Sequence, residues 1–90
     1  MQDKYKNQAI ARLHRLQGQM RGLEKMVEAG KYCPEILTQS SAIQKSLAGF
    51  NQLIMENHLR EHIVHQMKGK KDEQAIVELM RIYKLSNPTA

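Results

Sequence analysis

The chain has 90 residues, a formal net charge of +5 and one cysteine, and 41% of its residues are hydrophobic. A chain this short forms one small domain over residues 1–90, and a single cysteine excludes an internal disulfide and fits a reducing cytoplasm. No apolar run approaches the ~18 residues of a membrane span and no signal peptide opens the chain, so we expect a cytoplasmic protein. The positive charge favours a polyanionic partner, although many solvated surfaces are also basic.

The first predicted element is a helix that begins at Asp3 and ends before Gly30. Asp3 is a suitable N-cap, and glycine commonly follows the last residue of a helix. Between them, apolar residues recur at steps of three and four, the period of an amphipathic helix. They are Ile10, Leu13, Leu16, Met20, Leu23 and Val27. This stripe predicts the buried face of the helix.

A short connection leads to a second, much longer helix. Pro34 suits the first helical position, and no strong breaker follows before Gly69. Gly49 is tolerable inside the helix at a cost of ~1 kcal/mol. Apolar positions alternate spacings of four and three, which predicts a heptad-like seam. The seam positions are Ile36, Ser40, Ile43, Leu47, Phe50 and Ile54.

The last predicted element is a short helix after the break at 68–71. Asp72 is placed to cap it, and four side chains are predicted to face inward: Ile76, Leu79, Met80 and Tyr83. Residues 86–90 are predicted to fray. The long second helix has too little cover within its own chain. We therefore predict an all-α subunit of three helices that assembles with other copies through antiparallel helical bundles.

Three of the four histidines lie within eight residues, at His58, His62 and His65. On a helix these positions fall within about 60° of one another. Imidazoles at i and i+4 commonly offer two nitrogen ligands to one metal ion. The alternative is a solvated helix that happens to be rich in histidine. Because the histidines continue the apolar seam, we favour a metal site at a subunit interface.

Cys33 lies 25 residues before His58 and on the same side of the predicted helix. At a rise of 1.5 Å per residue the two are roughly 37 Å apart, so they cannot meet within one straight helix. In an antiparallel neighbour the start of the second helix would lie beside the end of this one. Cys33 of one subunit would then complete a site with His58 and His62 of another. The alternative role for Cys33 is that of a small buried hydrophobic residue.

The first helix carries five basic residues and no acidic residue between Lys4 and Arg21. Lys4, Arg12 and Arg15 fall within about 80° on a helical wheel, beside the apolar stripe and not on it. Such a row can contact phosphates, and Lys45 would extend it onto the second helix. No helix-turn-helix is visible, which favours recognition by phosphate contacts and DNA shape. The candidate DNA-binding residues are Lys4, Arg12, Arg15, Arg21 and Lys45; the alternative is a merely soluble basic face.

Two further functions are weighed against DNA binding. The pattern His58-x-x-Glu61-His62 matches one class of zinc peptidases, in which the glutamate is the general base. Such enzymes need a third, distant ligand and a cleft, and 90 residues in three helices supply little of either. We therefore do not expect an enzyme. A plain helical scaffold that binds an acidic protein is the other alternative, and it predicts no affinity for DNA.

Residues 12–22, Arg-Leu-His-Arg-Leu-Gln-Gly-Gln-Met-Arg-Gly, resemble the R-x-x-R-[IL]-x-G-Q opening of the CsoR/RcnR/FrmR repressors. The Tyr32-Cys33 turn, the Ile-Leu-x-Gln segment after it and the block at 58–62 match at that family's spacing. The resemblance covers about residues 8–84. It implies an all-helical subunit assembled as a dimer of dimers. It also implies a bacterial repressor that binds operator DNA without inducer and releases it when inducer binds.

The resemblance also implies a ligand set in which Cys33 comes from one protomer and His58 and His62 from its partner. Histidine at the last position is typical of nickel and cobalt sensors, whereas copper sensors commonly have cysteine there, although some have Cys-His-His. The nickel/cobalt branch adds an N-terminal histidine, whose aligned place holds Met1. The Met1 amine or the Asp3 carboxylate would have to substitute for it.

Ligand chemistry leaves the metal open among Ni(II), Co(II), Zn(II) and Cu(I), since one thiolate and two imidazoles are borderline donors. Three ligands satisfy trigonal Cu(I), whereas nickel or cobalt needs further donors from the N-terminus, His65 or water. We favour nickel/cobalt narrowly, with a copper sensor or a formaldehyde sensor of the same family as alternatives. Formaldehyde sensors rely on a proline at the second position, which is Gln2 here, and persulfide sensors need two cysteines.

Overall fold

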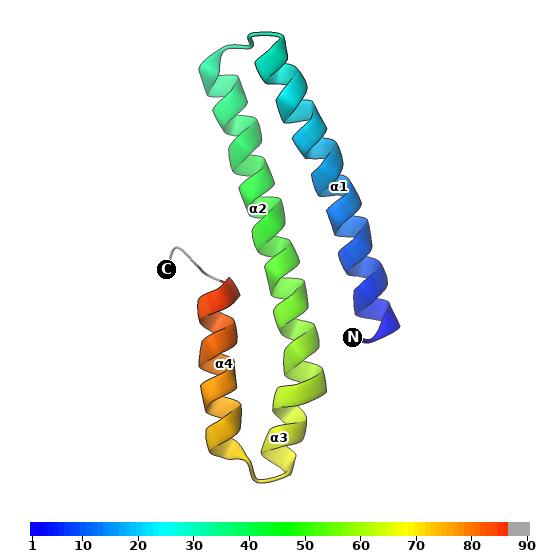
Figure 1. Cartoon of the computed structure of the whole chain (residues 1–90), viewed down its shortest axis with the longest axis vertical. Helices are drawn as coiled ribbons and strands as arrows, with labels where there is room; N and C mark the ends of the chain where they lie inside the picture. The colour runs from blue at the N-terminus through cyan, green and yellow to red at the C-terminus, as the bar shows by residue number, and fades with distance from the viewer. Residues whose placement is uncertain (87–90) are drawn as a thin grey trace.

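The computed structural model describes residues 1–86, in which every element of secondary structure is a helix. The elements are α1 (Asp3–Glu28), α2 (Cys33–His58), a π-helical turn η1 (Leu59–Ile63), α3 (Val64–Lys68) and α4 (Asp72–Ser86). The middle three join into one continuous rod over residues 33–68, and α1 and α4 lie against opposite sides of it (Figure 1). The predicted all-α subunit of three helices with a long second helix is confirmed.

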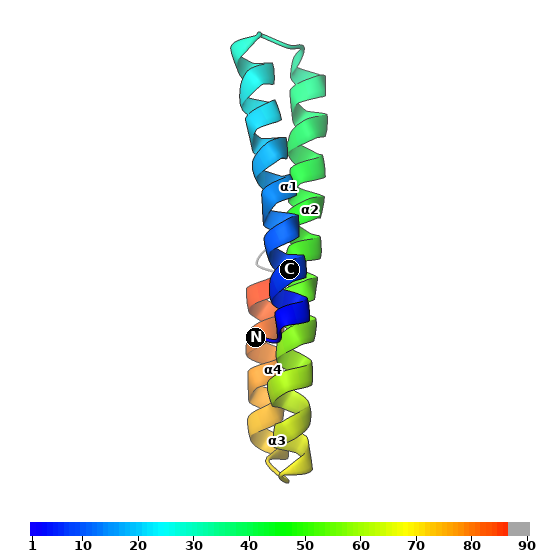
Figure 2. The same ribbon diagram turned by 90° about the vertical axis from the view of Figure 1, so that its right-hand side faces the viewer.

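The protomer is a single layer of helices, as its edge-on view shows (Figure 2). Its extents are 57 × 29 × 12 Å, and 10–12 Å is about the diameter of one helix with its side chains. The radius of gyration is 17.3 Å, compared with about 12 Å for a compact chain of this length. Stable domains bury their apolar faces between at least two layers. Within residues 1–86 neither flat face of this protomer has such cover.

Helix α1 is bounded by two different kinds of residue. The N-cap position is taken by Gln2 with an extended backbone, and Asp3 is the first helical residue, so the predicted Asp3 cap is wrong by one position. At that place the carboxylate still favours the positive end of the helix dipole. At the other end Gly30 has a φ of 65° and closes a Schellman motif, in which Lys31 N–H bonds to the carbonyl of Met26 at 3.0 Å.

The rod ends in the same motif but with a lysine in the strained position. Gly69 caps the rod with a φ of −82°, and the left-handed conformation falls on Lys70, at a φ of 61°. The N–H of Lys71 bonds to the carbonyl of Gln66 at 2.9 Å. The predicted break near Gly69 is confirmed, yet glycine does not take the conformation for which it is suited. Lys70 therefore carries the steric cost of a left-handed residue with a Cβ atom.

The contact between α1 and the rod does not follow the predicted apolar stripe. The core consists of Tyr5, Ala9 and Leu53, with Phe50 and Ile54 packed against it. Of the predicted stripe only Leu16 is buried and Leu23 half-buried. The other four are at least 39% exposed: Ile10, Leu13, Met20 and Val27. The prediction failed because α1 has two apolar-bearing faces, and the one with larger side chains faces away from the rod.

Helix α4 also directs its predicted apolar face away from the rod. Its four predicted inward residues (Ile76, Leu79, Met80 and Tyr83) are each at least 39% exposed. It packs on the rod through Ala75, which is 2% exposed, and through the half-buried Glu78 and Ile82. The small side chain of Ala75 permits close approach to the rod, which leaves the larger apolar face uncovered. Of the tail predicted to fray, 86–90, Ser86 is the last residue of α4, and 87–90 lie outside the described residues. Within residues 1–86 no helix is long and apolar enough to cross a membrane.

Candidate metal centre

The histidine pair lies where the rod changes from α-helical to π-helical geometry. His58 is the last residue of α2 and His62 lies in η1, where Val64 N–H bonds to the carbonyl of Leu59. The two imidazole rings are 4.6 Å apart between centroids and tilted by 38°. Single π-helical turns inside α-helices are rare and frequently mark functional sites. The turn was not predicted, because apolar spacing alone does not reveal it.

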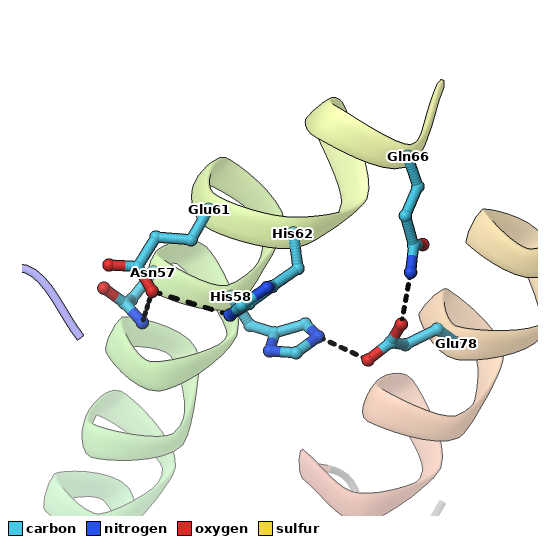
Figure 3. A network of polar contacts seen from close by, with 6 residues as sticks. All are labelled: Asn57, His58, Glu61, His62, Gln66 and Glu78. Carbon is cyan, nitrogen blue, oxygen red and sulfur yellow. Dashed lines mark hydrogen bonds and ion pairs between the residues drawn. The ribbon is translucent and has the colours of Figure 1, made fainter. Parts of the chain in front are cut away.

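A carboxylate from α4 fixes the first histidine of the pair. The Nε2 atom of His58 lies 2.7 Å from Oε1 of Glu78, and Gln66 Nε2 donates to Oε2 of Glu78 at 3.0 Å (Figure 3). The hydrogen bond from Gln66, followed by that from His58, lowers the pKa of Glu78. An ionised carboxylate only accepts, so His58 carries its proton on Nε2. In the neutral ring this leaves Nδ1 with a free lone pair, the arrangement usual in metal-binding histidines.

A second carboxylate, Glu61, lies beside the other histidine. Its Oε2 atom is 3.6 Å from His62 Nε2 and 3.7 Å from the Met1 amine. Asn57 donates to the same oxygen at 3.5 Å and is only 5% exposed. The N-terminus, 57 residues away from His58 in sequence, is thereby held next to the histidine pair. His62 itself remains accessible, since its side chain is 55% exposed.

Cys33, the remaining proposed ligand, does not lie near the histidine pair within one protomer. Cys33 is exposed and begins α2, whereas His58 ends it. Their separation of 25 residues corresponds to roughly 37 Å along the helix. Among residues 1–86 no three cysteine, histidine, aspartate or glutamate side chains converge to hold a metal ion. Asp3 and His65 are exposed. One protomer therefore presents two imidazoles at one end of the rod and the thiol at the other.

The basic residues form a second, separate region. Arg12 is half-buried, and its side chain lies between α1 and Gly49 of α2. Together with Arg15, Gln19 and Ser46 it lines a cavity of about 130 Å³. Lys4 Nζ lies 5.8 Å from the centre of the Tyr5 ring, and Arg21 and Lys45 are exposed. In residues 1–86 none of these five basic residues forms an ion pair.

Sequence reasoning missed Glu78 and Gln66 near the histidines, and Gln19 and Ser46 beside Arg12. Glu78 follows Ala75 by three positions and precedes Ile82 by four, which is a helical spacing. It was overlooked because the larger apolar residues of α4 predicted a different inward face. A small residue and a polar residue at this spacing are the available signal for a helix that approaches a polar partner closely.

The chain is similar in sequence to known repressors of transcription. A family model described as metal-sensitive transcriptional repressor matches residues 5–84. The copper-sensing transcriptional repressor CsoR of Bacillus subtilis (strain 168) is 38% identical over 81 residues, covering 90% of this chain and 80% of that protein. The transcriptional repressor RcnR of Escherichia coli (strain K12) is 33% identical over 81 residues, covering 87% and 90%.

Two solved structures share the fold. The copper-sensing repressor CsoR with Cu(I) from Geobacillus thermodenitrificans NG80-2 superposes with a TM-score of 0.82 at 34% identity, covering 94% of this chain and 88% of that one. The nickel-responsive transcriptional regulator InrS superposes with a TM-score of 0.80 at 28% identity, covering 89% and 90%. Fold and sequence thus define an all-helical regulator of transcription that senses metal ions.

The chain belongs to the family of metal-sensitive transcriptional repressors, the family of CsoR and RcnR. Members of this family are repressors and not enzymes. This family assignment does not support a zinc peptidase at His58-x-x-Glu61-His62.

Proposed function

We propose that this repressor binds operator DNA in its metal-free form and releases it when Ni(II) or Co(II) binds at a site shared between subunits. The observation that carries the proposal is the distribution of donors along one rod: His58 and His62 at one end, Cys33 at the other. A rigid helix keeps these ends apart. An antiparallel copy brings its own Cys33 to the histidine pair, and two equivalent sites form per dimer.

The exposed faces of the protomer support this assembly. The layer is 12 Å thick and leaves large apolar side chains uncovered on α1, on the rod and on α4, among them Leu13, Leu47 and Met80. Burial of such a surface is the main driving force of association. A homodimer formed as an antiparallel four-helix bundle covers α1 and α2, and pairing of two dimers covers more. We propose that the protein is a dimer of dimers. Each chain forms a single domain, and the assembly works in the cytoplasm without a membrane partner.

The donor set fits a borderline transition metal. Cys33, His58 and His62 supply one thiolate and two imidazoles. A nickel or cobalt site needs further donors, whereas a copper site does not. The Met1 amine is the best placed of these donors, because it and His62 Nε2 both lie near the same Glu61 oxygen. Asp3 on α1 and His65 on α3 are the other candidates. The proximity of the N-terminus to the histidine pair favours Ni(II) or Co(II), which prefer more than three ligands.

A Cu(I) sensor is the alternative, because Cys-His-His suffices for trigonal Cu(I) and two of the relatives are named as copper-sensing. Zn(II) also suits the donors. A formaldehyde sensor would use Cys33 together with the second position, which is Gln2 here. The hypotheses differ in their need for the N-terminus. Extension by Gly-Ser before Met1 moves the free amine away. It should weaken binding of Ni(II) or Co(II) strongly and leave Cu(I) affinity unchanged.

The decisive experiment measures DNA release. A duplex selected from a random library by the metal-free protein is labelled with fluorescein and bound, and anisotropy is followed on addition of Ni(II), Co(II), Zn(II), Cu(I) or formaldehyde. The inducer should lower DNA affinity by a coupling of ~1–3 kcal/mol, which is roughly 5–150-fold. Release by Cu(I) or formaldehyde alone would contradict the nickel/cobalt assignment. A protein that selects no duplex would contradict the proposed function itself.

A further inference from the structure

Arg12 occupies an unusual place for a residue that binds DNA. Its side chain crosses from α1 to α2 and lies over Gly49, so that a Cβ atom added to Gly49 would be 2.9 Å from Arg12 Nη1. Real Cβ atoms essentially never show such a contact, so one of the two groups would have to move. A glycine inside a helix costs ~1 kcal/mol relative to alanine. The absence of a side chain at position 49 therefore makes room for the guanidinium.

The groups around this guanidinium are all capable of donating hydrogen bonds. Arg12, Arg15, Gln19 and Ser46 line the cavity of about 130 Å³, and no carboxylate is among them. Arg12 and Arg15 form no ion pair within residues 1–86. Two unpaired guanidiniums beside a hydroxyl and an amide are the donors that bind phosphate oxygens well.

Gln19 lines the same cavity and has a polar atom that forms no hydrogen bond within residues 1–86. Its Oε1 atom is buried without a hydrogen-bond partner among the described residues. An unsatisfied buried polar group costs free energy, and the two ends of an amide exchange by a simple rotation. A phosphate oxygen only accepts, so it cannot bond to Oε1 itself. After rotation of the amide, Nε2 would take that place and could donate to a phosphate or to a water molecule bound to it.

We propose that Arg12, Arg15, Gln19 and Ser46 form a pocket for one phosphate of the DNA backbone and that Gly49 positions Arg12 in it. The inference rests on the proposed DNA binding and assigns Gln19 and Ser46 to it as contacts. Gly49 touches no phosphate; it acts through Arg12 by leaving space above α2. A side chain at position 49 pushes the guanidinium out of the pocket, while the helix itself tolerates alanine better than glycine.

The test uses the full-length, metal-free protein and a fluorescein-labelled 30-base-pair duplex of mixed sequence, titrated at several salt concentrations. Gly49→Ala should weaken binding about tenfold and lower the slope of log K against log[salt] by about one unit for each engaged pocket. The melting temperature should stay equal or rise, because alanine favours the helix. Gln19→Ala and Ser46→Ala should weaken binding less, since each removes a neutral donor.

Gly22→Ala is the matched control. Gly22 is also half-buried between α1 and α2, but a Cβ atom there would lie 3.7 Å from Gln39 Nε2, an ordinary contact. This variant should gain helix stability and bind DNA as the wild type does. A double-mutant cycle identifies the mechanism: in an Arg12→Ala background, Gly49→Ala should have no further effect on DNA binding.

Three outcomes would overturn the inference. They are wild-type DNA affinity in Gly49→Ala, an additive loss in the double variant, and unchanged binding when both Gln19 and Ser46 are alanine. A wild-type protein that binds no duplex at all would instead contradict the proposed function, which separates the two failures.

Discussion

The Nε2 atom of His58, at the end of α2, lies 2.7 Å from Oε1 of Glu78 on α4. This contact ties a proposed metal ligand to the helix that packs on the opposite side of the rod from α1. A histidine that donates its lone pair at Nδ1 becomes a stronger donor at Nε2, so the bond to Glu78 tightens when His58 is a ligand. The pair is therefore placed to pass ligand binding on to the position of α4.

The first prediction concerns Glu78→Gln. A neutral amide keeps the shape of the carboxylate but accepts a weaker hydrogen bond. Metal-free DNA affinity should be unchanged, and DNA release by metal should fall, with the coupling constant reduced at least about tenfold. Anisotropy titrations with and without metal measure the constant. Glu73→Gln, an exposed residue of the same helix, is the control and should behave as the wild type. Full coupling in Glu78→Gln would remove this bond from the switch.

The second prediction concerns the arginines. Arg12→Ala/Arg15→Ala should weaken DNA binding and flatten its salt dependence by about one unit of slope for each lost phosphate contact. Metal affinity should stay nearly intact, because both residues are at the α1–α2 contact and distant along the rod from His62. Lys68→Ala removes one positive charge at the end of α3 and serves as the control. Unchanged affinity in the double variant would exclude the basic row from DNA binding.

Much of the fold could be predicted from spacing and from helix-ending residues. Gly30 and the 68–71 break bound the helices correctly, since they act locally. Which face each helix buries was not predicted, because Leu13 and Met80 have the period of a core stripe although a single protomer leaves them exposed. The spacing of apolar residues predicts that a helix face is buried. It does not predict whether the chain's own rod or another subunit covers that face.

In the candidate site, too, local spacing could be predicted, whereas contacts between helices could not. His58 and His62 were predicted as a pair from their spacing, and their ring centroids lie 4.6 Å apart. Glu78 was not predicted, because its contact with His58 requires α4 to pack on the rod through the face that carries Ala75. The partial burial of Arg12 was missed for a similar reason: its space is created by Gly49, 37 residues away in sequence.

The third prediction concerns Lys70, the non-glycine residue with a positive φ within residues 1–86. A left-handed conformation costs a residue with a Cβ atom roughly 1–2 kcal/mol, partly offset in glycine by its greater freedom when unfolded. Lys70→Gly should therefore stabilise the protein by about 0.5–1 kcal/mol, seen as a higher urea midpoint at fixed protein concentration. Lys71→Gly should give no such gain. A lower midpoint for Lys70→Gly would contradict the assignment of strain.

The fourth prediction concerns assembly. A single layer with no side chain buried beyond 98% in residues 1–86 holds too little apolar surface to be stable alone. Sedimentation equilibrium should show dimers or tetramers at micromolar concentration. Leu13→Glu/Leu47→Glu, on exposed apolar positions of α1 and α2, should dissociate or unfold them. A folded wild-type monomer under these conditions would refute the shared site as well.

The fifth prediction tests whether the site is shared. Cys33→Ala should bind DNA but no longer release it on metal addition, because the thiolate is the strongest donor of the set. His58→Ala/His62→Ala should fail in the same way, since it retains the thiol and loses both imidazoles. Each variant alone has no complete ligand set.

Mixed assemblies decide between a shared site and a site within one chain. In a dimer of one Cys33→Ala subunit and one His58→Ala/His62→Ala subunit, the first supplies both histidines and the second supplies the cysteine. One of the two interfacial sites is then complete in each mixed dimer. Random exchange of equal amounts makes about half of the dimers mixed, so metal titration of the mixture should recover about one quarter of the wild-type stoichiometry. Subunit exchange is verified with differently tagged chains. No recovery despite proven exchange would mean that Cys33 does not meet His58 and His62 across the interface.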